Sequence, residues 1–266
     1  MTAASRTSWI LVPREHGAWG LLFQPFLAAA ILGKRWDPLF VPAALLLLTV
    51  FIVREPLLIL ARQHWVWRAE KPESQAARRC LAWQVPLTLL LSVLLAGRLP
   101  LAPLLLLGTL AMALTALAVW MALHNRQRSI PLQAASSLGL GSSAVLAALV
   151  ATGGIPGWTW RLWAILSLHS LLAILVVHWR LDVRQGRRIP AAAVWIVASP
   201  LVLAGLLFWG GVPRISAPVA FSAMINAGEL LRLRSPASRQ EPLVRVGIRT
   251  LAASLAHTAA TVAALW

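Results

Sequence analysis

The sequence has few charged residues, and few of those are acidic. Of its 266 residues, 12% are Asp, Glu, Lys or Arg and 59% are hydrophobic, with a mean hydropathy of +0.75. A soluble domain carries roughly one quarter charged residues, so this composition excludes an ordinary soluble protein and indicates a lipid bilayer as the surroundings. The single cysteine, Cys80, excludes an internal disulfide and a cysteine-based metal cluster.

Acidic residues are also scarce relative to basic ones. Eight Asp and Glu stand against 24 Lys and Arg, which gives a formal net charge of +16. In a soluble chain this excess would suggest a nucleic-acid partner. In a membrane protein it reflects topology instead, so no nucleic-acid partner is expected.

Long apolar runs follow one another along the whole chain. A helix crosses the ~30 Å hydrocarbon core with about 20 apolar residues, and these runs are too long and too uniformly apolar for barrel strands. We therefore expect an all-α polytopic membrane helix bundle. The first 12 residues are too short and too polar for a signal peptide, so the first run is expected to be a retained span. Nine spans are predicted, at residues 17–33, 38–60, 80–97, 99–123, 131–152, 158–178, 190–210, 213–231 and 243–265.

Basic residues are divided unevenly between the two sides of this bundle. If the N-terminus lies inside, 19 of the 24 Lys and Arg fall in inner segments and five fall in outer segments. This asymmetry follows the positive-inside rule and supports an odd number of spans. We expect a cytoplasmic N-terminus and a C-terminus on the outer side.

Acidic residues and histidines gather on the predicted inner side too. Seven of the eight Asp and Glu and four of the six His lie there, although carboxylates contribute little to orientation. Together they predict a polar pocket that is open to the cytoplasm. The residues expected to line it are Arg14, His16, Arg54, Glu55, His124, Asn125, Arg126, His178, Asp182, Arg184, Arg187 and Arg188.

Arg54 and Glu55 are especially informative because apolar residues flank them on both sides. An ionisable group inside a span costs on the order of 2.5 to 3.5 kcal/mol unless it is paired or hydrated. Pro56 follows them and is expected to break or kink the helix, which would free backbone groups to line a cavity. Two alternatives stay open: these charges line a site, or they serve structural pairing at headgroup level.

A second informative cluster closes the span at 158–178. His178 and Asp182 share one face if the helix continues, because they are four residues apart. Arg187 and Arg188 follow in a basic turn, where guanidinium groups could bind phosphate through two hydrogen bonds each. The alternatives are a helix-end salt-bridge patch and contacts with anionic lipid headgroups.

The chain is expected to form a single membrane domain over residues 1–266. A His-Trp pair at 64–65 and another at 178–179 each lead into charged residues. The similarity of these two segments suggests two repeat halves, 14–125 and 131–235, followed by a ninth helix at 243–265.

Two segments near the start of the chain resemble the YwiC-like family of bacterial membrane proteins. They are the stretch from Pro13 to Trp19, which reads PREHGAW, and the Arg54-Glu55-Pro56 end of the second span. The resemblance covers most of the chain. It implies a multi-pass protein of the bacterial cytoplasmic (inner) membrane.

The overall plan is also similar, more distantly, to the UbiA superfamily of intramembrane prenyltransferases. That resemblance implies two aspartate-rich motifs, after the second and sixth spans, that hold Mg²⁺ and an isoprenyl diphosphate. By this match Asp182 would be a metal ligand, and Arg187 or Arg188 would contact the diphosphate. His178 stands where the second motif has its preceding Asp, and the Asn and Asp pattern of the first motif is absent. A two-cluster Mg²⁺ site of the usual kind is therefore not expected, and the cofactor stays open.

Three functions stay open at this point. The first is a divergent UbiA-like transferase for an isoprenoid or lipidic anionic substrate, with Asp182, Glu55 and His178 around the reacting group and arginines on the phosphate. The second is a non-catalytic transporter or lipid-binding membrane protein. The third is an accessory subunit that binds a partner through the charged segment 68–79. Substrate, metal and oligomeric state are not determined by these patterns.

Overall fold

The computed structural model describes residue 11 and residues 16–69, 71–126 and 129–266, and within these ranges the chain is helical without any β-strand. This confirms the all-α fold class. In chain order the elements are α1 (His16–Leu32), α2 (Phe40–Ala61), the π-helix η1 (Arg62–Trp67), α3 (Pro72–Ala96), α4 (Leu101–Leu123), α5 (Ile130–Gly141), α6 (Ser143–Thr152), α7 (Gly157–Arg184), α8 (Ala192–Trp209), α9 (Pro213–Arg232), α10 (Pro236–Arg239) and α11 (Leu243–Leu265).

Seven helical segments of the described chain are long and apolar enough to cross a membrane. They are α2 with η1, α3, α4, α5 with α6, α7, α8 and α11. The apolar part of α1, Ala18–Leu32, is shorter, and α9 carries buried polar residues such as Ser222 and Asn226 that lower its hydropathy. Each predicted span overlaps a helix or a helix pair, but nine crossings stay a prediction.

Two predicted boundaries differ from the structure. The third span was predicted from residue 80, but α3 begins at Pro72, a residue that suits the first helical turn because it needs no N–H partner there. The fifth span, 131–152, is interrupted at Ser142. The Ser142 hydroxyl donates to the Gly139 carbonyl at 2.6 Å, and the neighbouring glycines lower the helix propensity.

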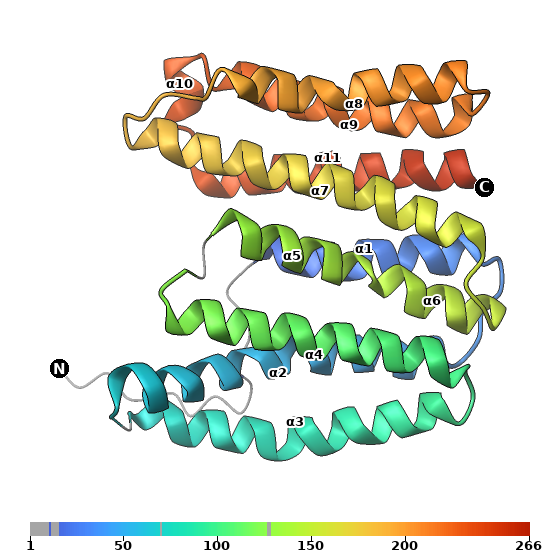
Figure 1. Cartoon of the computed structure of the whole chain (residues 1–266), viewed down its shortest axis with the longest axis vertical. Helices are drawn as coiled ribbons and strands as arrows, with labels where there is room; N and C mark the ends of the chain where they lie inside the picture. The colour runs from blue at the N-terminus through green and yellow to red at the C-terminus, as the bar shows by residue number, and fades with distance from the viewer. Residues whose placement is uncertain (1–10, 12–15, 70, 127–128) are drawn as a thin grey trace.

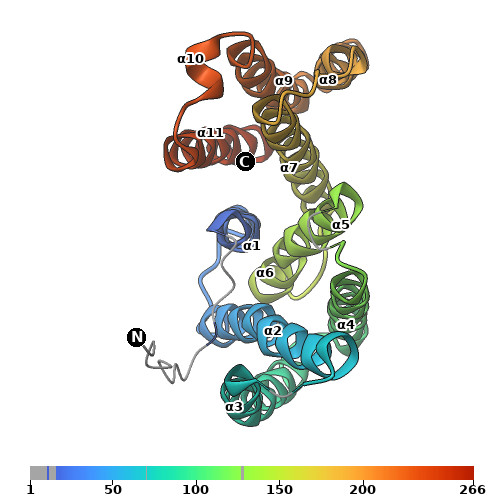
Figure 2. The same ribbon diagram turned by 90° about the vertical axis from the view of Figure 1, so that its left-hand side faces the viewer.

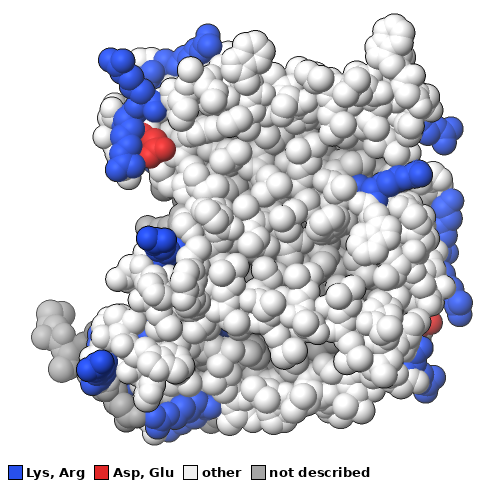
Figure 3. All heavy atoms as spheres, viewed as in Figure 1, with Lys and Arg blue, Asp and Glu red and all other residues white. Residues whose placement is uncertain are grey.

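The helices lie side by side, and their connections gather at two opposite ends (Figure 1). One end holds η1, the α4–α5 connection, the α7–α8 connection and α10, and we call it the η1 end. The segments predicted to be cytoplasmic therefore share one end of the molecule. In the face drawn in Figure 3, nearly all Lys and Arg atoms lie near the two edges, and a broad strip between them is almost free of charge. Such a strip suits contact with lipid tails.

The view along the helices places α2, α3 and α4 at one end of the long axis and α8, α9, α10 and α11 at the other (Figure 2). Helices α1, α5 and α6 lie between these groups. The outward faces of α3, α4 and α8 carry exposed apolar side chains such as Leu89, Leu106 and Val202. Because lipid tails are as apolar as these side chains, this exposure is expected of a membrane protein.

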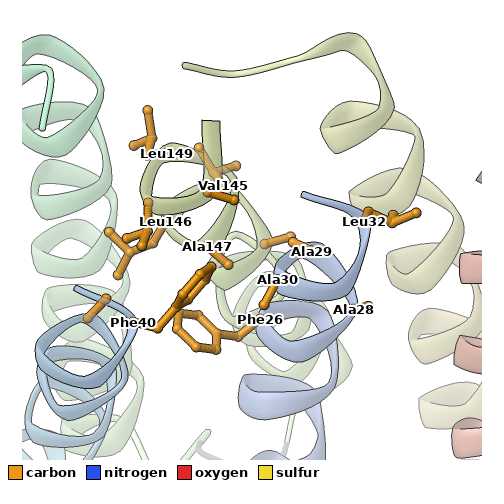
Figure 4. Packing of buried hydrophobic residues seen from close by; sticks show 14 of the residues in the cluster. Phe26, Ala28, Ala29, Ala30, Leu32, Phe40, Val145, Leu146, Ala147 and Leu149 are labelled. Atoms are coloured by element: carbon orange, nitrogen blue, oxygen red, sulfur yellow. The ribbon is translucent and has the colours of Figure 1, made fainter. Parts of the chain in front are cut away.

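Helices α1, α2 and α6 form the largest apolar core (Figure 4). Phe26 of α1 meets Phe40 edge-on, with ring centroids 5.9 Å apart. Small residues allow α1 and α6 to approach closely: a Cβ atom on Gly33 would overlap the Cβ of Ala151. The Ser143 hydroxyl donates to the Leu22 carbonyl across the same interface at 2.7 Å, which fixes the two helices in register.

Candidate functional site

A cleft of about 680 Å³ opens at the η1 end, between the end of α2, η1, the start of α3 and α4. We call it the η1 cleft. Its polar lining comes from Gln63, His64, Arg68, Ser74 and Arg78, and its apolar lining includes Leu57, Leu60 and Val119. A cleft of this size can hold a small ligand or the head of a larger one.

Local backbone features create this cleft. Helix α2 continues past Pro56 and then widens into the π-turns of η1, a geometry that often marks functional sites. The π-helix η1 ends at Trp67, and the next residue, Arg68, takes the left-handed conformation at φ 48°. The Gln63 side-chain oxygen accepts a hydrogen bond from the Lys71 backbone N–H at 3.2 Å, and the Lys71 ammonium lies 4.1 Å from the centre of the Trp67 ring. These contacts hold the turn between η1 and α3 in place.

Gln63 is the most unusual residue of the cleft. Its side chain is only 4% exposed, and its Nε2 atom has no hydrogen-bond partner among the described residues. A buried amide N–H without a partner costs free energy that a bound acceptor would recover. The exposed Arg68 and Arg78 place positive charge at the same opening. The cleft therefore offers hydrogen-bond donors and cations above an apolar wall.

The two predicted residues near the end of α7, His178 and Asp182, contact different neighbours. His178 Nε2 lies 3.1 Å from Oε1 of Gln133 on α5. Asp182 accepts a hydrogen bond from Arg187 at 3.1 Å, and both side chains are well exposed. The helix does continue through Arg184, so His178 and Asp182 are one turn apart on α7, but no described contact joins them. Arg188 is exposed in the turn that follows.

The predicted residues near the end of α4 are exposed at the η1 end. His124 ends the helix, and its Nδ1 lies 2.8 Å from the Trp120 carbonyl oxygen. Asn125 follows in the left-handed conformation at φ 56°, which asparagine tolerates better than most residues. Arg126 closes the turn through its backbone N–H, which donates to the Met121 carbonyl at 2.8 Å.

The remaining predicted residues belong to α1 and α2. Arg54 and Glu55 are half-buried within α2, directly before Pro56, and η1 begins later in the chain, at Arg62. Both are engaged in contacts. His16 begins α1, but its side chain lies outside the described part of the chain, as does all of Arg14.

The described residues do not fit a metal site. Within them, no group of three or more His, Cys, Asp or Glu side chains comes close enough to hold an ion. Asp182, the one residue matched to a metal ligand, has the cationic Arg187 as its neighbour. Mg²⁺ requires several oxygen ligands, so this donor set is insufficient for the predicted role.

A second polar cluster, which the sequence patterns did not single out as a site, joins α7, α9 and α11 at the η1 end. Arg180 is only 1% exposed, and its guanidinium donates to Glu229 at 3.0 Å and to the Ser238 carbonyl at 3.0 Å. Arg249 donates to both carboxylate oxygens of Glu229, at 2.6 and 2.9 Å, and to both of Glu241, at 2.7 and 2.9 Å. We call Arg180, Glu229, Glu241 and Arg249 the four-charge cluster.

The chain around α10 completes the four-charge cluster. Arg184, one of the residues predicted to line the pocket, donates to the backbone carbonyls of Arg239 and Glu241. The hydrogen bonds from Arg249 are the main cause that lowers the pKa of the Glu241 carboxyl below its ordinary value. One sequence signal could have revealed the cluster: Arg249 is a charged residue within a helix of membrane-spanning length, where a charge requires a partner.

Comparison with known proteins adds one finding. A family model described as YwiC-like protein matches residues 12–148, which is more than half of the chain and includes every residue of the η1 cleft. No curated protein and no solved structure matches the chain.

Proposed function

The chain belongs to the YwiC-like family, and we propose that this membrane protein binds an anionic amphiphile in the η1 cleft. The ligand class is a phosphate head on an isoprenoid or acyl tail. By the positive-inside rule the η1 end faces the cytoplasm, so the ligand would enter from the inner leaflet. This develops the lipid-binding alternative of the sequence analysis.

The observation that carries the proposal is the combination of groups in one cleft. Arg68 and Arg78 supply positive charge, and Gln63 supplies a buried N–H without a partner in the described chain. Leu57 and Leu60 supply an apolar wall on the α2 side. A phosphate satisfies the first two groups because it is an anion with several acceptor oxygens, and a hydrocarbon tail satisfies the third.

Prenyl transfer is not part of the proposal. That reaction was expected to involve Asp182, Glu55 and His178, but the described contacts of His178 and Asp182 lead to different neighbours. The donor set of the described residues also lacks the carboxylates that a Mg²⁺-diphosphate complex needs. Binding requires neither feature.

The test is ligand binding to the full-length protein in lipid nanodiscs, with a polyprenyl phosphate as probe and the polyprenyl alcohol of the same length as its uncharged counterpart. We expect the phosphate to bind more tightly than the alcohol. Charge-assisted hydrogen bonds contribute about 1.5 to 3 kcal/mol each, so Arg68→Asn and Arg78→Gln should each weaken binding by about 10-fold to 100-fold. Asparagine at 68 tolerates the left-handed backbone there, which separates loss of charge from backbone strain.

The matched control is Arg98→Gln, which removes an exposed arginine from the α3–α4 connection at the opposite end. It should leave the affinity for the phosphate unchanged. Equal affinity for the phosphate and the alcohol would contradict the proposal. So would equal weakening by Arg68→Asn and Arg98→Gln, because binding would then report the overall charge of the protein.

A further inference from the structure

Two histidines lie side by side in the interior of the other half of the molecule. His169 of α7 is 3% exposed and His257 of α11 is fully buried. Their rings are stacked, with centroids 4.3 Å apart and planes inclined by 17°. Both lie in the middle of helices that are long and apolar enough to cross a membrane, and ionisable residues in such places are expensive.

Each ring makes one hydrogen bond and keeps one nitrogen without a partner in the described chain. His257 Nε2 lies 3.1 Å from the Pro218 carbonyl oxygen, and His169 Nδ1 lies 3.1 Å from the Ser222 hydroxyl. Because a carbonyl oxygen only accepts, Nε2 of His257 must carry the proton, and Nδ1 of the neutral ring is then a bare acceptor. His257 Nδ1 and His169 Nε2 are the two nitrogens that lack partners.

A small cavity with apolar and polar lining residues lies beside His169 and beside two members of the four-charge cluster, Arg180 and Glu229. Its volume is about 20 Å³, which is room for about one water molecule. The polar residues that line the cavity are His169, Arg180, Asn226, Glu229 and Thr250. The polar lining residues of this cavity thus include one ring of the histidine pair and two charged groups at the η1 end.

We propose that His169 and His257 form an intramembrane proton-binding site that takes up one proton, loaded from the η1 end through the cavity beside Glu229. The proton arrives from water and attaches to one of the two nitrogens that lack partners, so the pair gains one positive charge and water supplies the proton. Two imidazolium rings stacked at this distance would repel each other, so the pair does not take up a second additional proton.

The charged groups around the pair agree with this assignment. The charged residues that line the cavity are Arg180 of α7 and Glu229 of α9, which pair with each other, and Arg249 of α11 also pairs with Glu229. From α1, the neutral side chain of Gln24 contacts α11, where it accepts a hydrogen bond from Ser254. A proton arriving at the pair therefore meets no unpaired cation among these groups.

The test is ¹⁵N NMR of histidine-labelled, full-length protein in lipid bilayers, acidified from about pH 8 to about pH 4, a range that spans the ordinary titration of histidine. Signals are assigned by their loss in His169→Gln and His257→Gln, with His124→Gln as a control that removes an exposed histidine. Should a buried variant fail to fold, magnetisation transfer between the stacked rings assigns both signals in the unaltered protein.

We expect exactly one imidazolium for the two rings together at the acidic end. Two rings that stay neutral throughout would overturn the proposal, as would two rings that both become charged. The route by which protons reach the pair is tested with Ala173→Leu. The larger side chain at this lining position occupies the cavity and should slow proton exchange at the pair several-fold. Ala102→Leu on the exposed face of α4 is the matched control, and equal exchange rates in the two variants would refute entry through this cavity.

Discussion

Replacing Glu229 by glutamine should destabilise the protein more than removing its buried partner Arg180. The carboxylate accepts three guanidinium hydrogen bonds, one from Arg180 and two from Arg249. Glutamine keeps the size and loses the charge, which leaves the fully buried Arg180 with only the more distant Glu241, at 3.8 Å, as a counterion. Breaking a buried ion pair in this way costs about 3 to 5 kcal/mol.

Removing Arg180 instead should cost less. Arg180→Met takes the buried cation away, and Glu229 keeps both hydrogen bonds from Arg249. The expected loss is about 1.5 to 3 kcal/mol, the value of one or two charge-assisted hydrogen bonds. The control is Asp182→Asn, which breaks an ion pair whose side chains are 37% and 69% exposed and should cost at most about 1 kcal/mol.

The assay is reversible denaturant unfolding of the full-length protein in micelles, followed by helical circular dichroism. The expected order of destabilisation is Glu229→Gln, then Arg180→Met, then Asp182→Asn. If Glu229→Gln were no more harmful than Asp182→Asn, the cluster would be screened by water and the argument from burial would fail. If Arg180→Met were the costliest, the stability would come from packing of the arginine stem.

Further predictions concern helix packing, acid stability and orientation. Gly33→Ala should destabilise the α1–α6 interface because the added methyl has no space, whereas Gly108→Ala, with nothing nearby, should be neutral or slightly stabilising in the same unfolding assay. Because Glu241 has a lowered pKa when folded, its contribution is complete above its ordinary value of 4.5 and is lost as the pH falls below that. Glu241→Gln should therefore flatten the loss of thermal stability on acidification, and an unchanged slope would contradict this origin. In a cysteine-free background, a membrane-impermeant maleimide applied to intact cells should label Arg98→Cys and not Arg188→Cys, and the reverse pattern would invert the predicted topology.

The sequence determined the fold class and the grouping of the connections. Apolar runs of membrane-spanning length can bury their backbone polar groups only as helices, and the uneven distribution of arginine indicated which connections lie on the same side. The structure places those connections at one end of the molecule. The apolar pattern predicts a span only as far as residue 178 and leaves a longer helix as a condition, and the structure shows that α7 does continue through Arg184.

The tertiary structure alone decided which polar residues meet. Arg180 and Glu229 are 49 residues apart in the sequence, and the His169–His257 pair is joined across 88 residues, so no spacing rule relates either pair. Asp182 had the stronger sequence signal, but α7 directs it to the exposed Arg187, while Arg180, only two residues earlier, lies on the buried side. The physical reason is helical geometry: two residues along a helix is about 200°, so the packing of α9 and α11 against one side of α7 determines which of two neighbouring charges becomes buried.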